Sequence, residues 1–220
     1  MKKSFGLAIF ILILSVLACK MPDFTSKSEP NSNNTSIQKE NSVTVSSNPR
    51  DDVIKASKKF TEQDSFQATM DGTGSKAIHM EIQYVAPDSY HIKNSPLMEI
   101  IIIGKSTYMK INGKWQKSPA SLSDSIPKMR DAFTEEGLKS LGDVEYVGED
   151  SVSGKTALLY RYKGNTLKDE TAYDSKLWIG KDNGLPLKIE VEYPNSDLLK
   201  QMTTVYDYDT KVTIESPTGN

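Results

Sequence analysis

The stretch MEIIIIGKSTYMKINGKWQKSP, residues 98–119, decides between two interpretations of this chain. Its Gly-Lys-Ser at 104–106 looks like the end of a phosphate-binding loop, but that loop needs a glycine at position 99, where Glu99 stands. A second Gly-Lys-Thr at 154–156 fails in the same way, because Glu149 holds the required position. Both are followed by residues rich in β-formers. The sequence therefore predicts turns between strands here, and no nucleotide site.

The same stretch predicts part of an antiparallel sheet. Its run of isoleucines favours a strand over 99–103 that is buried on both faces. Gly104 and Lys105 then form a turn, and residues 107–111 return antiparallel to the first strand. Asn112-Gly113 is typical of a two-residue type I′ hairpin leading into 114–116.

Alternating apolar and polar residues extend this pattern over the rest of the chain. Each alternating segment gives a strand with one apolar and one polar face. Turn sequences at 71–74, 86–88, 94–96 and 182–184 separate the segments. We expect about ten or eleven strands, including 66–70, 78–84, 143–149, 156–162, 176–179, 186–193 and 203–214.

Two amphipathic helices are predicted. The first covers 51–60, with Val53, Ala56 and Phe60 on one face and acidic residues in its first turn. The second lies between the two groups of strands and shows apolar residues at helical spacing. Its apolar face consists of Leu122, Ile126, Met129 and Phe133.

The N-terminus has the features of a secretory signal at residues 1–18. Lys2 and Lys3 precede an uncharged apolar run that is too short for a comfortable membrane span. Ala18 directly before Cys19 resembles a bacterial lipoprotein cleavage box. The resemblance implies that Cys19 is acylated and becomes the new N-terminus when residues 1–18 are removed. The alternative is an ordinary signal peptide followed by a coincidental cysteine.

Composition limits the partners. Removing residues 1–18 takes two of the 27 basic residues and none of the 29 acidic ones, which leaves 25 against 29 and a net charge of −4. This balance argues against nucleic acid and against an anionic membrane surface, so we expect membrane attachment through the acyl chains of Cys19. With one cysteine the chain has no internal disulfide, and the domain must be stable through its core.

Three segments are expected along the chain. Residues 1–18 are the signal peptide, and residues 19–48 are the acylated cysteine and a disordered tether rich in Ser, Asn, Thr and Lys. About 30 such residues reach on the order of 30 Å, enough to hold a domain clear of the headgroups. Residues 49–217 are one folded domain.

The order of segments resembles the LolA-like and LppX-like envelope lipoproteins over residues 60–214. The resemblance is carried by structural stretches, which identify a fold better than an activity. These are SFQATM at 65–70, VAPDSYH at 85–91, EIIIIG at 99–104, YMKINGKW at 108–115, LWIG at 177–180 and GLP at 184–186. The resemblance implies an α+β fold: a strongly curved, unclosed antiparallel half-barrel whose concave apolar face is covered by helices.

The resemblance also implies a groove for an acyl chain or a lipidated protein. The second predicted helix, with Leu122, Ile126, Met129 and Phe133, would be its lid. Alternatively, the residues of this face simply pack on that helix as core. The candidate groove residues are Phe66, Met70, Met80, Ile82, Tyr84, Leu158, Tyr160, Leu177, Ile189 and Val191.

The sequence predicts neither an enzyme nor a cofactor. The chain has two histidines, His79 and His91, both expected to face solvent, and no set of ligands for zinc or for Ser/His/Asp catalysis. We expect a monomer, anchored on the extracytoplasmic side of a bacterial membrane, that binds or transfers an acyl ligand or a lipoprotein. The alternative is a structural or sensory lipoprotein that uses the same fold as an interaction platform.

Overall fold

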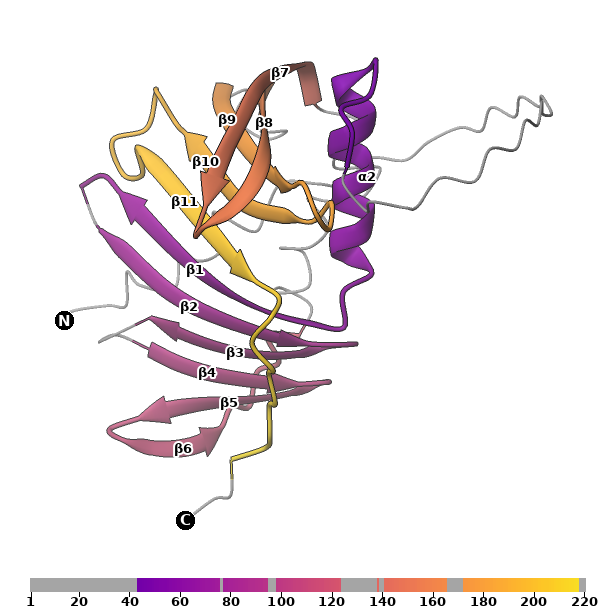
Figure 1. Cartoon of the computed structure of the whole chain (residues 1–220). Helices are drawn as coiled ribbons and strands as arrows, with labels where there is room; N and C mark the ends of the chain where they lie inside the picture. Colours follow the sequence, from indigo (N-terminus) through magenta and orange to yellow (C-terminus); the bar gives the residue numbers. More distant parts are fainter. Residues whose placement is uncertain are drawn as a thin grey trace, which may run out of the picture.

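The computed structural model describes residues 43–75, 77–94, 98–123, 138, 141–165 and 172–217. In this part of the chain eleven strands form one sheet in the order β6-β5-β4-β3-β2-β1-β11-β10-β9-β8-β7. Helix α2 (Pro49–Thr61) lies against one side of it (Figure 1). The end strands β6 and β7 do not pair with each other, so the sheet is a curved, unclosed half-barrel. The predicted fold class is confirmed.

All neighbouring strands run antiparallel, and two meanders make up the sheet. The first meander contains the first six strands, and the second contains the remaining five. β1 and β11 join them through a register that runs from Gln67 opposite Asp207 to Thr73 opposite Gln201. The strands are β1 (Ser65–Thr73), β2 (Ile78–Val85), β3 (Ser89–Asn94), β4 (Met98–Ile103), β5 (Ser106–Ile111), β6 (Lys114–Lys117), β7 (Leu141–Val152), β8 (Lys155–Asn165), β9 (Ala172–Gly180), β10 (Pro186–Glu192) and β11 (Gln201–Asp207).

The isoleucine strand and its two turns are confirmed. In β4, Ile100, Ile101 and Ile102 are all buried, although they alternate between the two faces. β5 pairs antiparallel with β4, as predicted. Asn112 and Gly113 both have positive φ, 51° and 79°, which is the backbone of a type I′ turn.

Helix α2 begins at Pro49, two residues before the predicted start at residue 51. The Asn48 side chain accepts a hydrogen bond from the Arg50 N–H at 3.2 Å and caps the helix. Val53, Ala56 and Phe60 are at most 2% exposed, so the predicted apolar face is the buried one. No described helix is long and apolar enough to cross a membrane.

The last strand is shorter than predicted. We expected a strand over 203–214, whereas β11 ends at Asp207. The Asp207 carboxylate accepts hydrogen bonds from the backbone N–H groups of Asp209 and Thr210 and from the Thr210 hydroxyl, at 2.8, 3.3 and 2.6 Å. A carboxylate that binds the following backbone favours a turn, which takes the chain out of the sheet.

Residues before the helix contact the turn after β9 and the helix itself. The Val43 N–H donates to the Lys181 carbonyl at 2.6 Å, and the Ser46 N–H donates to the Asp52 carboxylate at 3.0 Å. These contacts extend the packed region to the N-terminal side of residue 49. The boundaries of the signal peptide, the tether and the domain stay predictions.

The buried hydrogen bond between α2 and β8 is testable. Tyr160, 0% exposed, donates to Asp52 at 2.8 Å. We expect Tyr160→Phe to lower the free energy of unfolding by about 1–3 kcal/mol, because a buried carboxylate loses a donor. Urea denaturation measures this. The half-buried Tyr146 is the matched control, and Tyr146→Phe should change stability by less than about 0.5 kcal/mol. Equal effects of the two substitutions would contradict the assignment.

Candidate functional site

The concave face carries two hydrophobic clusters. We call the cluster on β1 to β4 the first core and the cluster under α2 the second core. Tyr206, on β11 between them, packs against both. The first core contains Phe60, Phe66, Ala68, Met70, Met80, Ile82, Tyr84, Tyr90, Ile92, Ile100 and Ile102. The second core contains Val53, Ala56, Leu138, Leu158, Tyr160, Leu177, Ile179 and Ile189.

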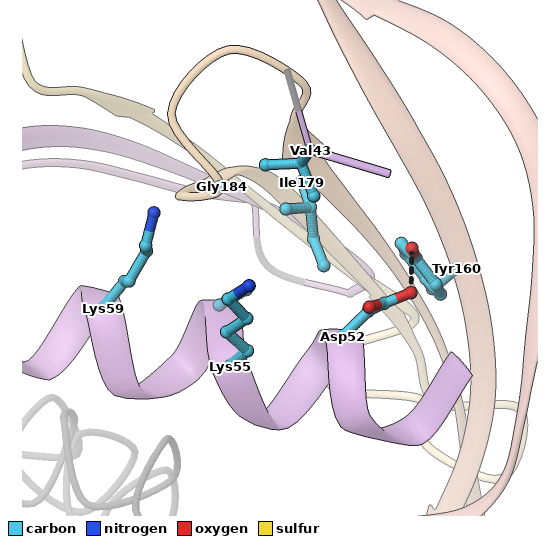
Figure 2. A pocket seen from close by; sticks show the side chains of 8 residues that line it. Val43, Asp52, Lys55, Lys59, Tyr160, Ile179 and Gly184 are labelled. Carbon is cyan, nitrogen blue, oxygen red and sulfur yellow. Dashed lines mark hydrogen bonds between the residues drawn. The ribbon is translucent and has the colours of Figure 1, made fainter. Parts of the chain in front are cut away.

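The second core is closed by α2, which packs mainly on β7, β9 and β10. The cavity between the helix and the sheet has a volume of only about 10 Å³, room for about one water molecule. Figure 2 shows its walls, with Asp52, Lys55 and Lys59 on the helix and Tyr160 and Ile179 on the sheet. An acyl chain could enter here only if α2 moved away.

The turn at 181–184 fixes the second half of α2. The Lys59 ammonium donates to the Asn183 carbonyl at 2.9 Å. Gly184 has φ +67°, and a Cβ at this position would lie 3.2 Å from the Lys59 nitrogen and 3.3 Å from a Val43 methyl carbon. The close approach of helix and turn therefore requires glycine at 184.

The first core has a different composition. Met70 and Met80 belong to it, and Met98, Met109 and Met202 pack against it, so five of the chain's eight methionines gather here. Methionine is flexible and polarizable, and it fills irregular apolar spaces. Of the described helix, mainly Phe60 reaches this half, with its ring centroid 5.1 Å from that of Phe66.

All ten predicted groove residues lie on the concave face. They divide between the two cores, and all except Val191 are buried. Their role in ligand binding stays a prediction. The first core contains Phe66, Met70, Met80, Ile82 and Tyr84, and the second contains or is contacted by Leu158, Tyr160, Leu177, Ile189 and Val191.

The predicted lid is described only at its start. Leu122 packs against the first core, and its N–H donates to the Thr107 hydroxyl at 3.0 Å. Ile126, Met129 and Phe133 lie outside the described residues.

The prediction missed a row of tyrosines on the concave face. Burial raises the pKa of Tyr162 and Tyr206, and raises that of Tyr193 to about 12, so all three stay neutral near pH 7. Ser57 on α2 is 1% exposed, and its hydroxyl has no hydrogen-bond partner among the described residues. The alternation of β11 could have identified Tyr206, which follows Thr204 on the concave side. The face therefore combines apolar surface with neutral hydroxyl groups.

The concave face carries little charge. Asp52 is the one charged side chain among the buried residues that the structure describes, and Tyr160 and Ser46 bind it. Apolar walls with a few neutral hydroxyls suit a neutral apolar ligand better than an ionic one.

The two histidines lie on the convex face and differ in exposure. His79 is exposed and lies 2.6 Å from Asp71, whereas the His91 side chain is 18% exposed and lies 2.9 Å from Glu99. His91 lies on the expected polar face but is less exposed than expected, because Glu99 of the neighbouring strand β4 and the Trp115 ring lie beside it. Within the described ranges, no group of three or more His, Cys, Asp or Glu side chains is placed to hold a metal ion.

A second hollow, of about 320 Å³, lies between the β7–β8 hairpin and strands β1 and β11. Its charged groups already bind each other. Lys155 lies 2.6 Å from Asp209, and Asp207 holds the Thr210 hydroxyl. Because these groups are satisfied within the chain, we give this hollow no binding role.

Comparisons with known proteins agree with this geometry. The family model described as "MucB/RseB N-terminal domain" matches residues 107–216, half of the 220-residue chain. The crystal structure of lipoprotein LppX from Mycobacterium tuberculosis is similar, with TM-score 0.58, 10% identity, and coverage of 76% of this chain and 97% of that one. LprF from Mycobacterium bovis gives TM-score 0.57, 11% identity, and coverage of 77% and 97%. At these identities the likeness concerns the fold. The search of curated proteins found no match.

The half-buried Glu99 predicts a pH effect. Burial alone would raise the pKa of Glu99, but hydrogen bonds from Lys110 and His91 outweigh it and hold the pKa below its ordinary value. Its stabilising contribution is therefore complete above the pKa of an unfolded glutamate, about 4.3, and is lost as the pH falls through the lower folded value.

We expect Glu99→Gln to lower the free energy of unfolding at pH 7 by about 1 kcal/mol, and by less near pH 3. Urea denaturation at both pH values measures this. The exposed Glu81, 3.9 Å from Lys93, is the control, and Glu81→Gln should have almost no effect. A Glu99→Gln loss that is equal at both pH values would refute the pairing.

Proposed function

We propose that this chain, which belongs to the MucB/RseB N-terminal domain family and has the LolA/LppX-like fold, is a lipid-binding lipoprotein of the bacterial envelope and not an enzyme. The proposed ligand is an acyl chain, on a lipid or on a lipidated protein. Its proposed place is the first core, on the concave side of β1 to β5.

The difference between the two cores carries this proposal. The second core packs closely against α2, and the cavity between them is very small. The Asp52–Tyr160 hydrogen bond and the contact of Lys59 with Asn183 hold the helix in this place. The first core gathers the methionines and has only the end of α2 over it among described elements. A ligand can therefore displace side chains of the first core without the loss of these polar contacts.

The energetics allow useful binding. Burying about ten methylenes of an acyl chain contributes roughly 8 kcal/mol, at about 0.8 kcal/mol each. Part of this is lost when the groups that now bury the first core are displaced, since Met80 and Ile92 are 4% and 1% exposed. The proposal therefore requires that apolar contacts with the ligand replace the apolar contacts that now bury the first core.

Attachment to the membrane is proposed through acylated Cys19, with residues 20–48 as the tether. Support comes from the apolar N-terminal segment, the position of Ala18 and the single cysteine. Two acyl chains hold a protein firmly, whereas one gives marginal binding.

One observation favours a second candidate, an interaction platform with no ligand. Nine of the ten candidate groove residues are buried by other residues of the chain itself. If the concave face never opens, the outer surface of the same fold would carry the function.

Native mass spectrometry of the full chain, purified from its own envelope, separates the two candidates. Lipid binding predicts a co-purifying acyl ligand and the uptake of a fluorescent fatty acid after its removal. Repeated recovery of empty protein that also ignores the fatty acid would favour the platform.

A matched pair of half-buried positions then tests the location. Met109 packs against the first core and Val191 against the second. We expect Met109→Gln, which keeps the shape but adds a polar amide, to weaken fatty-acid binding by at least about fivefold. Val191→Thr should change it by less than about twofold. The reverse order would refute the first core as the site.

A further inference from the structure

The hairpin at the edge of the sheet has an unusual charge. Between residues 104 and 123 the chain has four lysines and no acidic residue, although the protein as a whole has net charge −2. Three of the lysines, Lys110, Lys114 and Lys117, lie on the hairpin formed by β5 and β6. This edge thus carries a local positive charge on an acidic protein.

This edge also exposes apolar groups. Ile111, directly before the turn, is 46% exposed and is one of the few large apolar side chains that the described surface exposes to this degree. Trp115 lies across the hairpin from Lys110 and is half-buried. We call Lys110, Ile111, Lys114, Trp115 and Lys117 the basic edge.

Two lysines of the basic edge are available to a partner. Lys110 is engaged, since its ammonium lies 2.8 Å from Glu99 and 5.5 Å from the centre of the Trp115 ring. Lys114 and Lys117 are exposed and make no ion pair with any described residue. Lys117 also affects Tyr108. The pKa of Tyr108 lies below its ordinary value, first because of a hydrogen bond with Ser216 and also because of the positive charge of Lys117.

The position of the basic edge leaves it accessible. Among the described strands, β6 is at the end of the sheet and pairs with β5 alone. Figure 1 shows β5 and β6 at the bottom of the half-barrel, at the opposite end of the sheet from β7 and away from α2.

We propose that the basic edge docks the folded domain on an anionic lipid surface, with Lys114 and Lys117 at the headgroups and Ile111 and Trp115 at the boundary with the acyl chains. Exposed lysines attract anionic headgroups, and tryptophan with an apolar neighbour favours the membrane interface. The net charge of the chain argues against such a partner, but attraction at this range depends on local charge, because salt screens charges farther away than about 10 Å.

Docking would orient the carrier. β5 contributes Met109 to the first core, and the next residues along the strand, Lys110 and Ile111, belong to the basic edge. The proposed membrane contact and the proposed acyl site thus lie on one hairpin. The contact itself does not depend on ligand binding.

The two tryptophans of the chain make the test specific. Trp178 is 5% exposed, so a lipid-borne quencher should reach only Trp115. The full chain is reconstituted from detergent into vesicles of phosphatidylcholine, alone or mixed with phosphatidylglycerol, with brominated acyl chains as the quencher. We expect quenching in the mixed vesicles, its loss in Trp115→Phe, and its reversal by high salt.

A double substitution provides the control. Lys114→Gln with Lys117→Gln should lower the ratio of docked to undocked protein roughly 30-fold, at about 1 kcal/mol per lysine and 1.4 kcal/mol per factor of ten. Lys55→Gln with Lys58→Gln, which removes two exposed lysines of α2, should leave quenching unchanged. Circular dichroism checks that both variants are folded.

Three results would overturn the proposal. Equal quenching in neutral and anionic vesicles would assign the contact to apolar insertion alone. Quenching that survives the loss of Lys114 and Lys117 would place it elsewhere. Absence of quenching in every vesicle would leave the basic edge to an acidic protein partner.

Discussion

The pairing of β1 with β11 is the constraint on which the rest of the structure depends. Each meander alone is a sheet with one apolar face, and an apolar face must be buried against another element. The pairing places Ala68 of the first meander opposite Tyr206 of the second, so their apolar faces become one concave surface. The Phe60 ring of α2 lies 5.1 Å from Tyr206, at this junction of the two cores.

The two cores differ in what covers them. α2 is held over the second core by packing and by polar contacts that do not exchange easily, among them the buried pair of Asp52 and Tyr160. The first core includes Met70 and Met80, and methionine side chains adapt to irregular apolar spaces. In our account the second core stabilises the domain and the first core binds the ligand. The basic edge, which begins directly after Met109 on β5, would bring that half to a membrane.

Local sequence patterns correctly predicted the features that depend on neighbouring residues alone. Asn112-Gly113 identified its hairpin because few other residues accept positive φ, and the alternation of residues 66–70 identified both faces of β1. The predictions were wrong where a single side-chain contact decides the outcome. The end of β11 depends on the Asp207 side chain, and the partial burial of His91 depends on Glu99 of the neighbouring strand. The division of the ten groove residues into two cores follows from the position of α2, which no single strand encodes.

The claim that the first core holds the acyl chain is tested most directly by photo-crosslinking. A fatty acid with a diazirine at the end of its chain is bound by the full protein, irradiated, and located by peptide mass spectrometry. The account predicts adducts on β2 to β5, around Met80, Ile92, Ile100 and Met109. Adducts confined to α2 and β8 to β10, around Val53, Leu158 or Leu177, would contradict it.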